Sequence, residues 1–286
     1  MADLDKQRVA INFGRAAKNY DKFAVLQKTV GERLIERLDL VRITPKVILD
    51  LGAGTGTTAR ALSGLYKSTE ILQLDLSLPM LFLSRSRSAR WFSKQRYLCA
   101  DAEKLPVASS RIDLVFSSLT FQWCNDLDAT FRETKRVLAP GGLFLFATLG
   151  PDTLRELRTS WATVDDVSHV NTFFDMHDIG DALVRTGMTG VVMDTENITL
   201  TYQDCYALMR DLKNVGAINA SKARPKGLTG KQKMQGMINA YEEYRSEEGL
   251  PVTYEIVYGH AWYPENERQS GGLAYVPVEN IRKRNR

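Results

Sequence analysis

A short apolar strand that runs directly into a glycine-rich turn is the feature that most restricts how this chain can fold. Lys46-Val-Ile-Leu-Asp50 leads into Leu51-Gly52-Ala53-Gly54-Thr55-Gly56, and residues 57–65 have the apolar spacing of a helix. Glycines at such a turn let a ligand approach the backbone, and the free N–H groups that begin the next helix attract a polar group. The segment predicts a strand–turn–helix unit with a ligand site at its turn.

The same design recurs along the next hundred residues. Strands are predicted at 71–75, 96–101, 112–116 and 143–147, and helices at 79–87 and 127–138. Further on, the pattern predicts helices near 176–186, 204–215 and 231–248, with strands around 191–202 and 252–258. Such alternation requires a mostly parallel sheet with helices on both faces, which is a doubly wound, Rossmann-like α/β fold.

The length of 286 residues favours one catalytic domain over two independent ones. Within it we expect a helical prelude at 1–45 that forms a lid, a ligand-binding core at 46–202, a helical insertion at 203–251, and a last strand with a polar tail at 252–286. Residues 5–40 carry apolar positions at helical spacing, which predicts the prelude helices.

The turn itself does not match a dinucleotide site. Nicotinamide enzymes use G-x-G-x-x-G to bind a pyrophosphate, whereas Thr57 stands here at the expected third glycine. The charge of Asp50, just upstream, would repel a pyrophosphate. It suits the cationic, phosphate-free amino-acid end of S-adenosylmethionine instead.

Acids end the next two predicted strands. Asp75 stands at about the spacing at which an acid meets ribose hydroxyls, and Asp101-Ala102 follows the third strand, where Asp101 could accept from an adenine amino group. Ligands of open α/β sheets bind beyond the carboxyl ends of the strands, so Asp50, Asp75 and Asp101 are expected to converge on a nucleoside. The structural alternative is that they are helix caps. Asp113 lies inside a strand and is interpreted as structural.

Composition excludes several other classes. Lys and Arg exceed Asp and Glu by 38 − 34 = 4, a mild excess that by itself says little about nucleic acid, and a nucleic-acid partner is not expected. Cys99, Cys124 and Cys205 include no CxxC pair, so neither a disulfide framework nor a metal site is expected. The N-terminus lacks a secretory pattern, and no stretch reaches the ~18 apolar residues that cross a bilayer. A cytoplasmic, membrane-free protein is expected.

Taken together, these motifs resemble class I methyltransferases over most of residues 46–148. The matching stretches are 47–56, Asp75, Asp101-Ala-Glu-Lys-Leu-Pro106, Phe116-Ser-Ser-Leu-Thr-Phe-Gln-Trp123 and Val137-Leu-Ala-Pro-Gly-Gly142. The resemblance implies a seven-stranded sheet with its last strand antiparallel. It implies S-adenosylmethionine contacts at Asp50, Gly52, Gly54, Asp75, Asp101, Ala102 and, at the end of strand four, Ser117.

A narrower resemblance extends to about Trp262. Phe13-Gly-Arg-Ala-Ala-Lys-Asn-Tyr-Asp21, Phe174-Asp-Met-His-Asp-Ile-Gly-Asp181 and Asp194-Thr-Glu-Asn-Ile-Thr-Leu-Thr-Tyr202 are similar to malonyl-acyl carrier protein O-methyltransferases of biotin synthesis. The resemblance implies methylation of the free carboxylate of a malonyl thioester, on acyl carrier protein or on coenzyme A. A carboxylate is ionised at neutral pH and needs alignment and exclusion of water rather than a general base.

Candidate residues for that chemistry come with structural alternatives. Tyr20 is the leading lid residue, because an aromatic ring can shield a sulfonium, although it is equally a helix-packing side chain. His177 is a candidate donor to the substrate carboxylate, against the more common structural histidine. The other substrate candidates are Gln122 and Trp123 after strand four, Phe174 beside His177, and Arg15 and Arg210 as carboxylate clamps that are alternatively surface arginines.

A basic stretch in the insertion is the candidate docking site for the carrier. Acyl carrier proteins are acidic, so a basic face is expected to meet them, and Lys222, Arg224 and Lys226 are the main candidates, with Lys213, Lys231 and Lys233 nearby. The alternative is a charge cluster that only solubilises the surface.

Two other functions remain open from the sequence alone. One is a class I methyltransferase that acts on RNA or on another small molecule. The other is an assembly factor or protein hydroxylase that uses the same fold, since a fold does not fix a function.

Overall fold

The computed structural model describes residues 3–88, 94–224, 227 and 229–265. Its centre is a seven-stranded sheet in the order β3-β2-β1-β4-β5-β7-β6. All strands are parallel except β7, which is antiparallel to both of its neighbours, β5 and β6. The strands are β1 (Val47–Leu51), β2 (Glu70–Asp75), β3 (Gln95–Cys99), β4 (Ile112–Ser118), β5 (Leu138–Leu149), β6 (Thr189–Tyr202) and β7 (Leu250–Trp262). The predicted sheet with an antiparallel last strand is confirmed.

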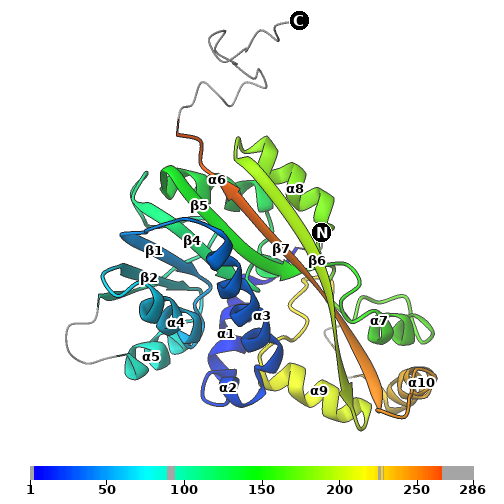
Figure 1. The fold of residues 1–286 in the computed structure, drawn as a ribbon. Coiled ribbons are helices and arrows are strands. Elements are labelled where there is room, and N and C mark those ends of the chain that lie inside the picture. The colour runs from blue at the N-terminus through cyan, green and yellow to red at the C-terminus, as the bar shows by residue number, and fades with distance from the viewer. Residues whose placement is uncertain (1–2, 89–93, 225–226, 228, 266–286) are drawn as a thin grey trace, which may run out of the picture.

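Helices cover both faces of the sheet (Figure 1). One face packs α3 and α4 against strands β1 and β4, through Val30, Leu34 and Leu62. The other packs α6 and α8 through Phe131 and Leu183. The α-helices are α1 (Lys6–Ala16), α2 (Tyr20–Phe23), α3 (Val25–Glu36), α4 (Thr57–Leu65), α5 (Leu78–Arg87), α6 (Leu127–Val137), α7 (Arg155–Ala162), α8 (Met176–Arg185), α9 (Cys205–Asn214) and α10 (Lys231–Glu242).

Strands β6 and β7 extend well past the rest of the sheet. They stay paired from Thr189↔Trp262 to Tyr202↔Leu250, although α9 and α10 lie between them in sequence. In Figure 1 the far end of this pair carries α7, α9 and α10, away from β1 and β2. Residues of these helices join the apolar cluster that also contains α3, including Leu208, Met237 and Tyr241. The insertion therefore builds a second wall beside the carboxyl edge of the sheet.

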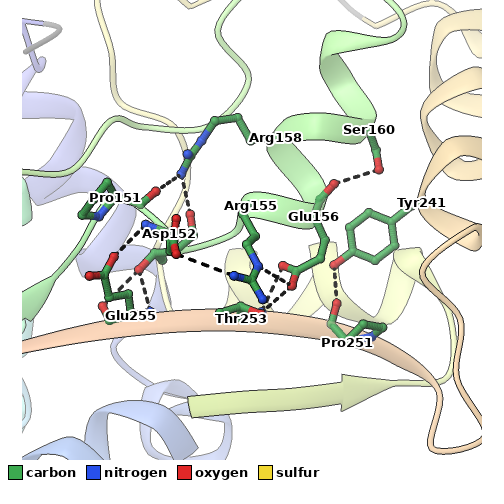
Figure 2. Close-up of polar contacts among 11 residues, drawn as sticks. Pro151, Asp152, Arg155, Glu156, Arg158, Ser160, Tyr241, Pro251, Thr253 and Glu255 are labelled. Carbon is green, nitrogen blue, oxygen red and sulfur yellow. Dashed lines mark hydrogen bonds and ion pairs between the residues drawn. The ribbon is translucent and has the colours of Figure 1, made fainter. Parts of the chain in front are cut away.

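Helix α7 is an element that the sequence pattern missed. It has only eight residues, and its buried Glu156 accepts from the backbone N–H of Thr253 at 3.1 Å and from the Thr253 hydroxyl, both on β7 (Figure 2). Just before it, the Asp152 N–H donates to Glu255 at 2.8 Å, and Arg158 donates to the carbonyls of Pro151 and Thr153. The contacts of Glu156 and Asp152 with β7 join residues about a hundred positions apart, which a local pattern cannot register.

Several element ends also differ from the sequence prediction. Strand β7 is longer, at 250–262, and β5 begins at Leu138 instead of 143, because Leu138 already pairs with Ile112 of β4. Helix α10 ends at Glu242 instead of 248, since the chain there turns into β7 through Gly249, whose φ is +118°. Pairing across the sheet decides these ends.

No helix in the described part of the chain is both long enough and apolar enough to cross a membrane.

Candidate active site

The glycine turn adopts the backbone that only glycine takes easily. Gly52, Gly54 and Gly56 have φ values of +82°, +53° and +75°. A Cβ on Gly52 would stand 1.9 Å from the Thr120 hydroxyl, so the turn packs tightly against the end of β4. A Cβ on Gly54 would meet nothing within 4 Å, so this glycine faces open space in which a ligand can reach the backbone.

Asp75 braces that turn from the end of β2. One carboxylate oxygen accepts from the Gly54 N–H at 2.8 Å, and the other accepts from the Ser77 N–H at 2.7 Å. Asp101 follows β3, and its Oδ1 accepts a hydrogen bond from the ammonium group of Lys6 on α1 at 2.9 Å. The two acids therefore stand on adjacent strand ends beneath the N-terminal helix.

These groups line a small pocket of about 90 Å³. The turn, the two strand ends, the end of β4 and helix α1 supply its walls, which include Lys6, Phe13, Tyr20, Gly52, Gly54, Asp75, Asp101, Ala102, Ser118, Leu119, Thr120 and Trp123. Its donors, acids and aromatic rings match the parts of a nucleoside that carries a cationic amino acid, so the residues present fit S-adenosylmethionine.

Burial disturbs both central carboxyls. Burial and the charge of Asp75 raise the pKa of Asp50 to about 7, opposed by a backbone N–H of Ala59. Burial also raises the pKa of Asp75 to about 6, although the N–H groups of Ser77 and Gly54 favour its ionised form. Oδ2 of Asp50 has no hydrogen-bond partner in the described part of the chain. A cationic or hydroxyl-bearing ligand would stabilise the ionised form of both carboxyls.

A second cavity of about 800 Å³ adjoins the first. It lies between α1–α3, the ends of β4 and β5, α7, the β6–β7 pair and α9, and most of its walls are apolar, such as Leu26, Leu149, Leu157, Trp161 and Phe173. Four residues line both spaces: Phe13, Tyr20, Leu119 and Trp123. Phe13 packs edge-on against Trp123 with ring centroids 5.3 Å apart. The two cavities thus share an aromatic wall.

Leu119 in this shared wall has an unfavourable backbone. Its φ is +54°, a value that leucine rarely adopts, and its N–H donates to Ala147 O at 2.8 Å. The carboxamide of buried Gln122 donates to Leu119 O at 2.7 Å and accepts from the Thr148 hydroxyl at 3.1 Å. Gln122 lines the larger cavity, but both of its polar atoms are used to hold the wall.

Most of the predicted cofactor residues gather at the small pocket. Gly52, Gly54, Asp75, Asp101 and Ala102 line it. Two others lie just outside its lining. Asp50 is buried behind the turn, and the Ser117 hydroxyl donates to Leu51 O at 2.8 Å within the sheet. The neighbouring Ser118, Leu119 and Thr120 take the place expected for Ser117.

The predicted substrate residues divide in two. Tyr20, Gln122 and Trp123 line the larger cavity, whereas Arg15, Phe174, His177 and Arg210 do not. Phe174 packs against the apolar cluster beneath α6 and α8. The His177 side chain is 83% exposed and bonds Asp175, the cap residue of α8, at 2.8 Å. Arg15 and Arg210 are exposed on α1 and α9, because the apolar faces of those helices point inward.

Some lining residues had no signal in the sequence. Lys6 reaches Asp101 and Glu103 across about a hundred residues. His169 and Asn171 line the larger cavity from the irregular segment between α7 and α8. Nothing in a single sequence distinguishes His169 from His177. In the described residues, no cluster of three or more His, Cys, Asp or Glu side chains is placed to bind a metal ion.

Comparison with known proteins gives the family. Residues 49–146 match the family model described as a methyltransferase domain. A malonyl-[acyl-carrier protein] O-methyltransferase of Methylovorus sp. (strain MP688) is 49% identical over 269 residues, which cover 92% of this chain and 90% of the relative. Its counterpart from Halorhodospira halophila is 43% identical, and the match covers 99% of this chain and 97% of the relative.

Solved structures agree on the fold. The YcgJ protein of Bacillus subtilis has a TM-score of 0.58 at 16% identity, over 82% of this chain and 98% of its own. A Haemonchus contortus phosphoethanolamine N-methyltransferase in complex with S-adenosyl-L-methionine has a TM-score of 0.53 at 20% identity, over 82% and 52%. The chain is a methyltransferase that uses S-adenosylmethionine, and it belongs to the malonyl-[acyl-carrier protein] O-methyltransferase family.

Proposed function

We propose that this enzyme methylates the free carboxylate of a malonyl group carried on acyl carrier protein, an early step of biotin synthesis. The observation that carries the proposal is the aromatic wall shared by the two cavities. Its four residues separate a pocket that suits the methyl donor from a large apolar space that suits an acyl thioester. The names of the relatives support the same substrate.

In the small pocket, different residues bind different parts of the methyl donor. We assign the ribose hydroxyls to Asp75, the adenine amino group to Asp101 and the amino-acid end to the open backbone at Gly52 and Gly54, with Asp50 behind it. When bound, S-adenosylmethionine supplies an electrophilic methyl group on a positively charged sulfur. Lys6 holds Asp101 in the free protein and has to share that carboxylate when the pocket fills.

On the acceptor side, the substrate carboxylate is already a nucleophile at neutral pH, so no residue has to remove a proton. Burial and the charges of Asp75 and Asp21 raise the pKa of Tyr20, so its hydroxyl stays neutral and can donate a hydrogen bond but cannot act as a base. We propose that Tyr20, Phe13 and Trp123 exclude water and align the carboxylate with the methyl group. Gln122 acts through Leu119, as a positioning residue.

Cofactor affinity should decrease as the pH is lowered, because Asp75 accepts hydrogen bonds best as a carboxylate. With its pKa at about 6, roughly one-tenth of Asp75 is ionised at pH 5, so the affinity for S-adenosylhomocysteine should drop at least about tenfold between pH 7.5 and pH 5. Asp50, with its pKa at about 7, acts in the same direction. Titration calorimetry at several pH values measures this, and constant affinity would contradict it.

The free protein should show the opposite trend in stability. Both carboxyls have pKa values above the usual value of 3.8, so between about pH 4 and 7 the folded state holds protons that the unfolded chain has released. Stability of the free protein therefore decreases as the pH rises through this window. Bound cofactor offsets that decrease.

We further propose that the carrier docks on the basic part of the insertion and that carrier-bound malonyl is preferred to malonyl-coenzyme A. Lys213 is exposed and lines the larger cavity. Lys222 is also exposed, and its Nζ forms an ion pair with Asp3 Oδ2 at 2.6 Å. Arg224 donates to Ser221 O at 2.9 Å, and Lys233 pairs with Asp165. Lys226 lies outside the described residues.

Reversing charge at this surface should weaken carrier binding. The pair Lys222→Glu and Lys226→Glu should raise the Michaelis constant for malonyl carrier about tenfold with little change in kcat, because rim charges act mainly on encounter. The matched control is Lys67→Glu with Lys94→Glu, two exposed lysines beside the opposite, amino edge of the sheet. Equal Michaelis constants for the two double variants would contradict this docking surface.

The experiment that tests the function is mass spectrometry of malonyl-acyl carrier protein after incubation with S-adenosylmethionine and the enzyme. A gain of one methyl group on the malonyl carrier, weaker on malonyl-coenzyme A and on succinyl carrier, is expected. Cofactor binding without any such gain would overturn the substrate and direct the search to RNA, small molecules or protein partners.

A further inference from the structure

Helix α2 carries Tyr20 but is too short to be stable by itself. It has four residues, Tyr20–Phe23, and none of them is buried in the core. Its N-cap residue, Asn19, makes no side-chain hydrogen bond to the helix. One isolated turn of helix is unstable, because its few hydrogen bonds do not offset the backbone entropy that it loses. Contacts with other elements therefore have to hold Tyr20 in the wall between the two cavities.

Asp21, the next residue along the chain, makes such contacts. Its Oδ1 accepts a hydrogen bond from the Thr55 hydroxyl at 2.6 Å. Its Oδ2 pairs with the guanidinium group of Arg87, the last residue of α5. The carboxylate thus joins α2 to the glycine turn and to α5 at the same time.

Thr55 belongs to the turn that faces the cofactor. It follows Gly54, whose N–H donates to Asp75, and it is only 2% exposed. Its carbonyl oxygen accepts from Arg60 of α4 at 2.9 Å, so its backbone is held as well. A hydrogen bond from a buried hydroxyl to a carboxylate is among the stronger ones in proteins, because the acceptor is charged and water competes little. The Thr55 side chain is therefore a firm anchor for α2.

Resting on the role proposed above for Tyr20, we propose that Asp21 is a positioning residue, whose hydrogen bond to Thr55 fixes the Tyr20 ring beside the cofactor pocket. Tyr20 and Asp21 are consecutive, so an anchored Asp21 also restricts the backbone of Tyr20. An aromatic ring attracts a cation only within about 6 Å of its centre, so a ring that is free to move away loses the contact. Asp21 acts in this way without touching the substrate.

Thr55→Val tests the bond from the side of the turn, since it removes the hydroxyl and keeps the size of the side chain. The affinity for S-adenosylmethionine should fall about tenfold, which is most of the effect of a lost cation–π contact. The affinity for S-adenosylhomocysteine should change about twofold or less, because that ligand lacks the positive sulfur. Asp21→Ala should show the same selective loss, and calorimetry with both ligands measures it. Equal losses for the two ligands would contradict the proposal.

Asp21→Asn separates the hydrogen bond from the charge. The side-chain oxygen of asparagine can still accept from Thr55, so this variant should keep the affinity for S-adenosylmethionine within about threefold of wild type. If Asp21→Asn binds S-adenosylmethionine as weakly as Asp21→Ala does, the carboxylate acts by its charge on the cationic ligand. That result would overturn the positioning role.

A double variant tests whether the bond works through Tyr20. In a Tyr20→Ala background, Thr55→Val should cause no further loss of affinity for S-adenosylmethionine, because the ring that it positions is absent. A further loss of about tenfold would show that Thr55 and Tyr20 act independently, and the proposal would fail.

Thr69→Val is the matched control for folding. Thr69 is 7% exposed, its hydroxyl donates to Pro45 O at 2.6 Å, and it precedes β2 at the amino edge of the sheet. This variant should lower the melting temperature and leave both affinities unchanged, whereas a selective loss like that of Thr55→Val would mean that any weakened fold produces the pattern. All of these measurements use cofactor binding alone. Failure of the enzyme to methylate malonyl carrier would therefore overturn the proposed substrate and leave the role of Asp21 to be decided by the binding results.

Discussion

Asp75→Ala should weaken cofactor binding by about 100-fold or more and lower methyl transfer at limiting cofactor by the same factor. A hydrogen bond to a charged group contributes about 1.5–3 kcal/mol, so the loss of two to the ribose amounts to at least ~3 kcal/mol. The variant also removes the acceptor of the Gly54 and Ser77 N–H groups, so the turn loosens. Calorimetry with S-adenosylhomocysteine and steady-state kinetics measure both effects.

Asp113 offers a matched control in the same sheet. Its carboxylate accepts from the N–H groups of Lys46 at 2.7 Å and Val47 at 2.9 Å, at the amino edge, opposite the pocket. Asp113→Ala should therefore lower the melting temperature and leave cofactor affinity within twofold. If it weakens cofactor binding as much as Asp75→Ala does, the effect of Asp75 comes from folding rather than from a direct contact.

Tyr20→Ala should lower kcat/KM for S-adenosylmethionine about 30-fold with a moderate effect on the Michaelis constant for the carrier. Its ring lies in the wall between the two cavities, and a desolvated cation–π contact contributes about 2 kcal/mol, which corresponds to that factor. Removing the ring also admits water next to the carboxylate. The affinity for S-adenosylmethionine should fall more than the affinity for S-adenosylhomocysteine, because only the former carries the positive sulfur.

Two companion variants define what Tyr20 does. Tyr20→Phe keeps the ring and should retain kcat/KM within about threefold if shielding and the cation–π contact dominate. Tyr206→Ala removes an exposed aromatic side chain of α9 that lines neither cavity and should leave kcat/KM unchanged. A fall in kcat/KM for Tyr20→Phe as large as for Tyr20→Ala would assign the role to the hydroxyl instead of the ring.

Much of the sheet and the small pocket follows from local pattern. The apolar run 47–51, the glycines at 52, 54 and 56, and the acids at 75 and 101 are short-range features, and parallel strands bring their carboxyl ends to one edge whatever the rest of the chain does. The predicted helix at 57–65 has the bounds of α4. Most residues that line the cofactor pocket could therefore be predicted. Asp50 and Ser117 are the exceptions, since they lie just behind the lining.

The substrate side could not be predicted in the same way. The sequence after β5 points to His177 and Phe174, yet α8 begins at Met176 and turns His177 outward, while Asn171 and His169 line the cavity. Which residues of an irregular segment face inward depends on its path. That path is set here by Trp161, Asp165 and Phe173, and not by any periodic pattern.

The sequence by itself determined the doubly wound sheet, the glycine turn and the acids at two strand ends, because each arises from the conformational preferences of neighbouring residues. Only the tertiary structure decided where α7 forms, how far β6 and β7 extend together, and which side chains meet in the larger cavity. Those features depend on contacts such as Glu156 to Thr253 and Lys6 to Asp101, between residues about a hundred positions apart. The free energy of such contacts exists only once the chain has folded.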